Sequence, residues 1–436
     1  MKSRLPKVLH PIAGKEMVRH VLDGAAAAGI GRAVVVVGHA ASQVRALLGE
    51  KVDYAAQQEQ LGTGHALLQA RPLLEGEADH VLALNGDVPL ISEETLRHMM
   101  ARHLDTGATL TLLTCFPEDT FGLGRILRDS SGRVRRIVEE AEAGPQEKAL
   151  QEVNGGAYCF AAPWLWANLS DLPQSKGGEF YLTDLVQLAE EAGERIEAVS
   201  AKEPWEGLGI NTRVYLAQAE AIVQRRLRER AMLSGATLID PNTTYLGADV
   251  EIGQDTVVYP NTTISGKTSV GNDCHIGPNS IIVDSTIGDG CHILASMIEG
   301  SRVDDSVEIG PFSHLRPGCH IESRVHIGNF GEVKKSRLGK DAKMGHFSYI
   351  GDADIGDNVN IGAGTITCNY DGFEKHRTIV GEDAFIGSDS MLVAPVNIGP
   401  RAVTGAGSVV NRDVPADTLA VGVPARHRPK KKRQPD

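Results

Sequence analysis

Aliphatic residues recur about every sixth position between Leu246 and Val410. The spacing is six at Leu246, Ile252, Val258, Ile264, Val270, Ile276 and Ile282; it loosens before Ile309 and then resumes as far as Ile398. Neither the helical nor the strand period explains a repeat of six. A prism with one short strand on each of three sides does, because each hexad forms one flat side. The repeat predicts a parallel β-helix, and about nine turns at roughly 4.8 Å each give a rod of about 45 Å.

The hexads are rich in isoleucine and glycine, and in this they resemble the left-handed β-helix, an exception to right-handed crossovers. Zinc is suggested by three Cys-His-Ile triplets that begin at Cys274, Cys291 and Cys319, and by His314, His320 and His326, which are spaced by six. The cysteines occupy the small position before the inward aliphatic residue, so we expect them to point into the prism. Residues six apart lie on different faces, so these histidines cannot converge in one chain. The repeat therefore favours a structural role over a zinc hydratase with this fold.

Length and charge restrict the class of protein. The 436 residues exceed what one core supports and predict at least two domains. The net charge of −12 argues against binding to nucleic acid or to an anionic membrane. No apolar run approaches the roughly 20 residues of a membrane span, and no signal peptide precedes the first predicted helix. Six cysteines in so long a chain do not indicate a disulfide framework.

Residues 1–211 alternate strand-like and helix-like segments, with a buried strand predicted at 33–38 and another at 80–84. This alternation is typical of an α/β doubly wound domain with a mostly parallel sheet, whose ligands bind beyond the carboxyl ends of the strands. Two segments lie there. The Gly-rich turn 60–66 offers free amides to a phosphate or a base. Asp87 ends a strand and supplies a carboxylate of the kind that Mg²⁺ prefers.

The rest of the chain divides into three segments. Residues 212–233 are predicted to form one long helix that joins the sheet to the β-helix as a stiff linker. The β-helix takes residues 234–426. The basic residues at 427–436 are predicted to be a disordered tail.

Motifs from nearly the whole chain resemble one family. They lie at 5–9, 60–65, 86–90, 124–126, 137–139, 178–184 and 209–213 in the front half, and at 315–318, 328–330, 334–335, 345–346, 349–352 and 360–372 in the rod. The run 361–372, Ile-Gly-Ala-Gly-Thr-Ile-Thr-Cys-Asn-Tyr-Asp-Gly, is the most specific. The chain is identified as a member of the bacterial bifunctional N-acetylglucosamine-1-phosphate uridyltransferases and glucosamine-1-phosphate acetyltransferases. This resemblance implies a nucleotidyltransferase domain followed by a left-handed β-helix.

The resemblance implies a first reaction in which UTP and N-acetylglucosamine 1-phosphate give UDP-N-acetylglucosamine and pyrophosphate. Such a transfer needs charge neutralisation and alignment more than covalent chemistry. By resemblance Asp87 and Asn211 hold Mg²⁺. The other residues implied for UTP and UDP-N-acetylglucosamine are Lys7 at phosphate, Gln57, Gly62 and Thr63 at uridine, Asn85 and Gly86 beside Asp87, and Gly124, Glu139 and Asn154 at the sugar.

The implied second reaction moves the acetyl group of acetyl-CoA to the amine of glucosamine 1-phosphate. An amine attacks a thioester only when unprotonated, so His346 would act as the base. Arg316, Lys334, Tyr349 and Asn360 would bind glucosamine 1-phosphate. The acetyl-CoA groove would consist of Ala363, Asn369, Tyr370, Ser388, Ala406 and Arg426. The loop 369–375 would reach a neighbouring chain in a homotrimer whose sites lie between subunits.

The family opens with a strand and a Gly-rich loop, whereas this sequence starts where the Met of that motif would stand. The strand is central in a doubly wound sheet, and the loop cradles phosphates. We therefore expect a poor uridyltransferase that keeps its acetyltransferase activity.

Two alternatives remain open: an acetyltransferase alone and a non-catalytic trimeric scaffold. By resemblance the protein is cytoplasmic, and its product supplies peptidoglycan and, in Gram-negative bacteria, lipopolysaccharide.

Overall fold

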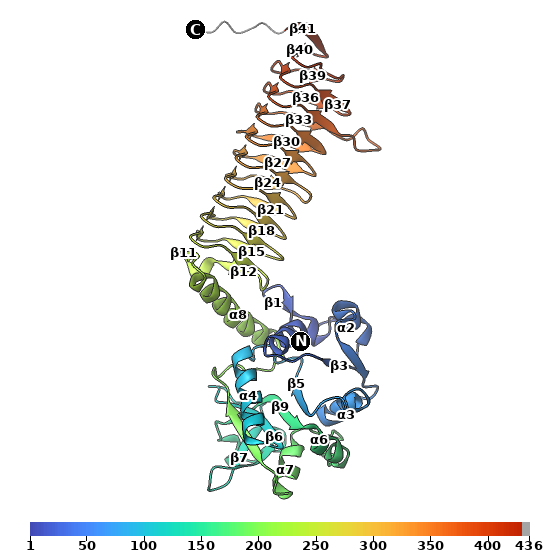
Figure 1. The fold of residues 1–436 in the computed structure, drawn as a ribbon, viewed down its shortest axis with the longest axis vertical. Helices are drawn as coiled ribbons and strands as arrows, with labels where there is room; N and C mark the ends of the chain where they lie inside the picture. The colour runs from blue at the N-terminus through green and yellow to red at the C-terminus, as the bar shows by residue number, and fades with distance from the viewer. Residues whose placement is uncertain (430–436) are drawn as a thin grey trace. The chain divides into compact units, whose positions relative to one another are not determined.

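The computed structural model describes residues 1–429. The chain divides into two compact units, Met1–Val223 (unit 1) and Gln224–Asp436 (unit 2) (Figure 1). The division falls within the helix α8 (Arg213–Leu233), which forms where the sequence predicts a long helix. None of the described helices is both long and apolar enough to cross a membrane.

Unit 1 contains a six-stranded sheet, a short antiparallel hairpin of β1 (Pro11–Ile12) and β2 (Lys15–Glu16), and a separate pair of parallel strands. The sheet consists of β5 (His80–Leu84), β6 (Leu110–Cys115), β7 (Arg125–Arg128), β8 (Val134–Val138), β9 (Val153–Ala161) and β10 (Ile196–Ser200); the pair is β3 (Val34–Val37) and β4 (Asp53–Ala56). β9 runs antiparallel to β5 and β6, whereas β6–β10 and β3–β4 are parallel. The prediction of a mostly parallel sheet is therefore wrong. The reason is the antiparallel β7–β8 hairpin, which returns the chain so that β9 enters in the opposite direction.

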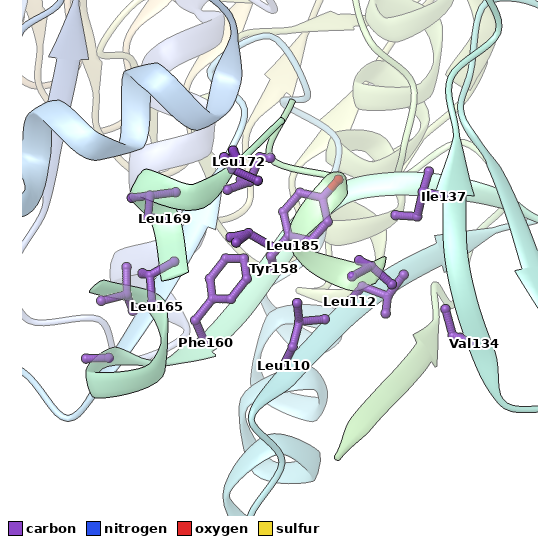
Figure 2. Packing of buried hydrophobic residues seen from close by; sticks show 14 of the residues in the cluster. Leu110, Leu112, Val134, Ile137, Tyr158, Phe160, Leu165, Leu169, Leu172 and Leu185 are labelled. Atoms are coloured by element: carbon purple, nitrogen blue, oxygen red, sulfur yellow. The ribbon is translucent and has the colours of Figure 1, made fainter. Parts of the chain in front are cut away.

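Helices cover both faces of this sheet: α3 (Thr63–Leu74), α6 (Ala162–Asn168) and α7 (Asp184–Glu191) on one face, and α4 (Glu93–Thr106) on the other. α1 (Met17–Ala27) and α2 (Ala41–Leu48) pack with β3 and β4. The short helix α5 (Pro145–Lys148) lies between β8 and β9 in sequence. On one face Tyr158 and Phe160 of β9 pack with Leu110 of β6 and Leu185 of α7, as Figure 2 shows. Alternate residues of the same strands form a second cluster with α4 on the other face. The doubly wound α/β class is thus correct for this unit.

Unit 2 is a three-sided parallel β-helix (Figure 1). Its first face begins with β11 (Thr237–Leu238), its second with β12 (Tyr245–Leu246) and its third with β13 (Glu251–Ile252). Within the described residues these faces contain 12, 10 and 9 strands. From β14 to β39, each strand pairs in parallel with the strand three places earlier in the chain, whereas β40 pairs with β38 and then with β41. The aliphatic residues of the hexads are buried in the prism, except Ile252 in the first coil, which is half-buried, and this confirms the interpretation of the repeat.

Two details of the rod differ from the prediction. The loose stretch before Ile309 is regular, because Ile298 and Val303 point inward and the chain simply takes steps of five residues there. The predicted tail begins too early. β41 (Ala425–Pro429) turns back and pairs antiparallel with β40 (Thr418–Gly422), so residues 427–429 belong to a strand. Residues 430–436 lie outside the described part of the chain.

The Cys-His-Ile triplets follow the repeat. Cys274, Cys291 and Cys319 are buried, as the small inward position requires. The three histidines spaced by six lie on the three different faces, in β24 (His314–Leu315), β25 (His320–Ile321) and β26 (His326–Ile327). Each is within ion-pair distance of a separate carboxylate, Glu299, Asp304 or Glu308. The predicted separation of these histidines within one chain is confirmed.

Unit 1 contains a buried histidine between α4 and the sheet. His103 is fully buried, and its ring nitrogens share hydrogen bonds with Thr111 Oγ1 at 2.9 Å and His80 Nδ1 at 3.1 Å. Burial, and then the neighbouring His80, lowers the pKa of His103 to about 4. The neutral ring is therefore the form that the folded unit holds.

We expect acid to destabilise unit 1 through this residue. In the unfolded chain His103 takes up a proton near pH 6.5, whereas in the fold it resists protonation down to about pH 4. The contribution of His103 to the free energy of unfolding is complete above pH 6.5 and falls as the pH drops toward 4. The free energy of unfolding should decrease by about 2 kcal/mol between pH 7.5 and pH 5. Urea unfolding followed by tryptophan fluorescence measures it, because Trp164, Trp166 and Trp205 all lie in unit 1.

The variant His103→Gln should flatten this pH dependence. His98→Gln is the matched control, because His98 is exposed on the same helix. An equally steep pH dependence in His103→Gln and in the wild type would contradict the assignment.

Candidate active sites

A lysine, a carboxylate and an amide meet at the carboxyl end of β5. Lys7 Nζ donates hydrogen bonds to Asp87 Oδ2 at 2.5 Å and to Asn211 Oδ1 at 2.8 Å. Asp87 and Asn211, predicted as metal ligands, therefore face one cation. A carboxylate and an amide oxygen suit Mg²⁺, which takes its remaining ligands from water and phosphate. In this structure the Lys7 ammonium contacts both of these oxygens.

Backbone contacts hold this cluster together. The segment after β5 turns back on itself, because Val88 N donates to Asn85 O at 3.1 Å. Ile210 N donates to Asp87 O at 2.9 Å, which attaches the segment before Asn211 to the turn. The close approach of Gly156 in β9 leaves no room for a side chain, since a Cβ there would lie 2.9 Å from Asn85 Nδ2. Asn85, Gly86 and Asp87 are thus fixed at one edge of the sheet.

The Gly-rich turn opens α3 beside the end of β4. Gln57 Nε2 donates to Gly62 O at 3.1 Å and lies 3.1 Å from His65 Nδ1. Thr63 Oγ1 accepts a hydrogen bond from Leu182 N at 3.0 Å. Gly62 has φ +98°, and a Cβ on it would lie 2.5 Å from Phe180 O. The structure therefore brings Gln57, Gly62 and Thr63 together at a helix N-terminus, where amides can meet an anion or a base.

Three predicted sugar residues form another cluster. Asn154 N donates to Gly124 O at 2.9 Å, and a Cβ on Gly124 would lie 3.4 Å from Glu139 Oε2. Asn154 Nδ2 donates to Tyr158 Oη at 2.6 Å. Burial raises the pKa of Glu139, while a hydrogen bond from Thr183 Oγ1 at 3.0 Å opposes this shift. A half-buried carboxylate with an open oxygen is suited to accept hydrogen bonds from hydroxyl groups.

Two neighbours of Glu139 were not predicted as site residues. Thr183 is buried and donates to Glu139. Burial, followed by the charges of Glu142 and Glu139, raises the pKa of Asp184 to about 6. Both residues lie at the end of the motif 178–184, which is one of the motifs that resemble the family. Their place in this motif was the signal in the sequence that could have identified them as site residues. Their contact with Glu139 joins α7 to β8, which no local pattern reveals.

In the rod, four predicted residues form a column along the corner between the first and second faces. Each comes two residues after the last residue of a stacked strand: β29 (Lys343–Met344), β32 (Asn360–Ile361), β35 (Phe385–Ile386) and β38 (Val403–Thr404). The residues are His346, Ala363, Ser388 and Ala406, and we call them the corner column. His346 is exposed, and the three above it are small. The corner column therefore presents small side chains in line with an exposed imidazole.

Backbone hydrogen bonds and glycine hold the corner column in register. Asp389 N donates to Ala363 O at 2.7 Å, and Gly407 N donates to Ser388 O at 2.8 Å. A Cβ on Gly362 would lie 2.5 Å from Ser388 N, so glycine before the column residue allows the coils to approach. Asn360, another predicted site residue, lies on the first face directly above Lys343.

Three cations gather at the other end of the second face. Arg316 follows β24, and Lys334 ends β27 (Gly331–Lys334) in the next coil. The ammonium of Lys375, together with burial and the Arg316 guanidinium, lowers the pKa of Lys334. Glu332 Oε1 accepts a hydrogen bond from Arg316 Nη1 at 3.1 Å. Like charges held this close favour a bound anion such as a phosphate.

Tyr349 lies on the second face between these two ends, and Asn369 follows the same face at the cationic end. Tyr349 is in β30 (Ser348–Gly351), and Asn369 Nδ2 donates to Tyr349 Oη at 3.4 Å and to Asp352 Oδ2 at 2.5 Å. The loop that follows carries Tyr370, which is 60% exposed, and Phe373, which is 93% exposed. Its aromatic side chains are thus turned away from the core of their own chain.

One chain does not bring all the predicted residues of the rod together. His346 precedes the strands of the second face, whereas Arg316 and Lys334 stand at their far end. Arg426 pairs with Val421, which packs over Gly405 next to the top of the corner column. The column and the cationic corner are therefore separate within a single chain.

Three family models match this chain. The nucleotidyl transferase model matches residues 2–224. The bacterial transferase hexapeptide model, with six repeats, matches residues 377–412, and the hexapeptide repeat of succinyl-transferase matches residues 267–295. With the three parallel ladders, these repeats identify the rod as a left-handed β-helix.

The sequence similarity to known proteins covers both units. The bifunctional protein GlmU of Heliobacterium modesticaldum is 47% identical over 97% of this chain and 92% of its own length. That of Geobacillus sp. has the same identity and coverage, and that of Carboxydothermus hydrogenoformans is 47% identical over 97% of this chain and 94% of its own. A solved UDP-glucose pyrophosphorylase complexed with UDP-glucose covers 51% of this chain and 91% of its own, at 17% identity and a TM-score of 0.42, too low to carry an argument.

We expect Gly62→Ala to destabilise unit 1 and to weaken any ligand bound at the Gly-rich turn. The new Cβ would collide with Phe180 O, and the positive φ adds strain. Gly76→Ala is the matched control, because Gly76 also has a positive φ, +81°, but has nothing within 4 Å. Strain alone should cost about 1 kcal/mol in both variants. Urea midpoints measured by tryptophan fluorescence should therefore fall clearly further for Gly62→Ala, and equal midpoints would contradict the collision.

Proposed function

Because this chain belongs to the GlmU family of bifunctional proteins, we propose that it makes UDP-N-acetylglucosamine in two steps. Acetyl-CoA first acetylates glucosamine 1-phosphate, and UTP then uridylylates N-acetylglucosamine 1-phosphate. The observation that carries the proposal is that each unit has its own cluster of matching residues, around Asp87 and around His346. The similarity over 97% of the chain favours two activities over an acetyltransferase alone or a scaffold. The same similarity gives no support to the expectation that this chain is a poor uridyltransferase.

In the uridylyl transfer, a phosphate oxygen of the sugar attacks the α-phosphorus of UTP. The bond to the β-phosphate breaks, and pyrophosphate leaves. Mg²⁺, held by Asp87 and Asn211, would neutralise charge on the phosphates. Lys7 would turn from Asp87 to a phosphate oxygen, and its contact with both ligands in this structure supports that assignment.

The remaining residues of unit 1 would orient the two substrates. Gln57, Gly62 and Thr63 would hold the uridine at the start of α3, and Asn85 and Gly86 would line the same site. The sugar would lie against Gly124, Glu139 and Asn154. Two properties of Glu139 support this role. Burial raises its pKa, and one of its carboxylate oxygens accepts a hydrogen bond from Thr183, which leaves the other oxygen for a sugar hydroxyl.

In the acetyl transfer, the amine nitrogen attacks the thioester carbonyl carbon. His346 takes the proton from the amine, and the C–S bond breaks. The imidazolium then returns this proton to the departing sulfur, so that CoA leaves as the thiol. Ala363, Ser388 and Ala406 would accommodate the CoA chain along the corner column, and their small side chains support this direction. Arg426 would lie at its end.

Arg316 and Lys334 would bind the phosphate of glucosamine 1-phosphate, with Tyr349 and Asn360 at its ring. Since these cations lie away from His346 within one chain, we propose a homotrimer in which neighbouring chains complete each site. Asn369 and Tyr370 would contribute from the projecting loop to the acetyl-CoA groove of a neighbour. The exposed Tyr370 and Phe373 support this role.

We also propose that the protein works in the cytoplasm, where UTP and acetyl-CoA are available, and that its product supplies cell-wall synthesis. Its six cysteines are unpaired in the structure, as is usual in a reducing compartment.

We expect Asp87→Asn to lower uridylyl transfer about 100-fold or more and to leave acetyl transfer unchanged, because one charge of the cation site is lost. Pyrophosphorolysis of UDP-N-acetylglucosamine, measured across a Mg²⁺ titration, tests this. Asp105→Asn is the matched control, because Asp105 is exposed on α4. An unchanged rate and Mg²⁺ dependence would rule out the metal assignment.

We expect His346→Ala to lower acetyl transfer by about 100-fold or more, because the amine loses its base. Uridylyl transfer should stay as in the wild type. His326→Ala is the matched control, since His326 lies on the first face one coil below Lys343. Release of free CoA thiol from acetyl-CoA and glucosamine 1-phosphate measures the rate, and a wild-type rate would refute the role of His346.

A further inference from the structure

A buried arginine lies directly beside the proposed sugar site. The Arg125 side chain is only 3% exposed. Its guanidinium donates to Leu123 O and to Thr120 Oγ1, the latter at 3.1 Å, and it pairs with Glu140 Oε2 at 3.0 Å. Lys148 Nζ lies 3.3 Å from the other oxygen of Glu140. One charge network therefore connects the turn before β7, the end of β8 and α5.

Both members of this ion pair adjoin residues of the sugar cluster. Arg125 follows Gly124, and Glu140 follows Glu139. A Cβ on Gly124 would lie 3.4 Å from Glu139 Oε2 and 3.0 Å from Ile137 Cγ2, so the two strands are close here. The ion pair joins the strands just beyond this approach. The spacing of Gly124 and Glu139 is thus linked to the distance between Arg125 and Glu140.

Strand pairing alone does not account for the ion pair. β7 has a second Arg–Glu pair at its far end, where Arg128 makes hydrogen bonds of 2.7 and 2.6 Å to Glu152. Burying a guanidinium is costly, and Arg125 Nε has no hydrogen-bond partner. A buried apolar residue would hold the strand at lower cost. The position beside Gly124 and Glu139 therefore points to function.

We propose that Arg125 and Glu140 are positioning residues that set the gap between Gly124 and Glu139, and so the affinity for the sugar phosphate. The proposal rests on the proposed uridyltransferase function. Neither side chain touches the reacting phosphates. Their effect passes through the neighbouring residues that would contact the sugar.

The test compares E140Q with E152Q in the full-length protein. Both remove one carboxylate charge from an Arg–Glu pair of β7, but only Glu140 is next to the sugar cluster. We expect E140Q, which removes the negative charge of the buried Arg125–Glu140 pair, to raise the KM for N-acetylglucosamine 1-phosphate about tenfold, equivalent to about 1.4 kcal/mol of binding free energy. The KM for UTP and the acetyl transfer rate should stay within about twofold of the wild type, and E152Q should leave all three unchanged.

Three results would overturn the proposal: an unchanged sugar-phosphate KM in E140Q, an equal rise in E152Q, or a parallel rise in the KM for UTP. R125M is the second variant, because it removes the cation and keeps much of the volume. If it retains the wild-type urea midpoint, it should show the same selective rise. If it unfolds unit 1, E140Q decides the question. Absence of uridylyl transfer in the wild type would instead refute the proposed function.

Discussion

The hydrogen bonds between successive coils determine what the rod can present to a substrate. Each coil repeats the one below, so a residue two places after an inward strand lies above its counterpart in the previous coil. This places Ala363 and Ser388 in line with His346, although they are 17 and 42 residues away in sequence. Glycine before the column residue permits the close approach. The proposed acetyl-CoA groove thus follows from the register of the backbone.

Unit 1 positions its proposed site residues in a different way. Its sheet is buried on both faces, so functional side chains are restricted to the strand ends. The turn after β5 carries Asp87, and hydrogen bonds from distant segments bring Lys7 and Asn211 to it. In the rod, the proposed site lies along a corner. In unit 1, it lies at the ends of strands.

Much of this was predictable because the relevant signals are local. The hexad pattern gave the prism, and the position of Cys274 within it gave the burial of that side chain. Pairings between distant segments left no such signal. The antiparallel entry of β9 and the contact of Thr183 with Glu139 depend on partners far away in sequence. The sequence motifs named Gly124 and Glu139, but only the structure reveals the ion pair beside them.

The steps of five residues in the rod have a wider meaning. A coil needs one inward side chain on each face, and the length of chain at its corners is free to vary. The loop after Asn369 is the largest such variation. Cys368 before the loop pairs with Val393 of the next coil, and Thr378 after the loop pairs with Ala353 of the previous coil, so the ladders continue across the insertion. Such a solenoid can lengthen a corner without a change of core. New surface can therefore be added to this fold one corner at a time, while the coils on either side stay as they are.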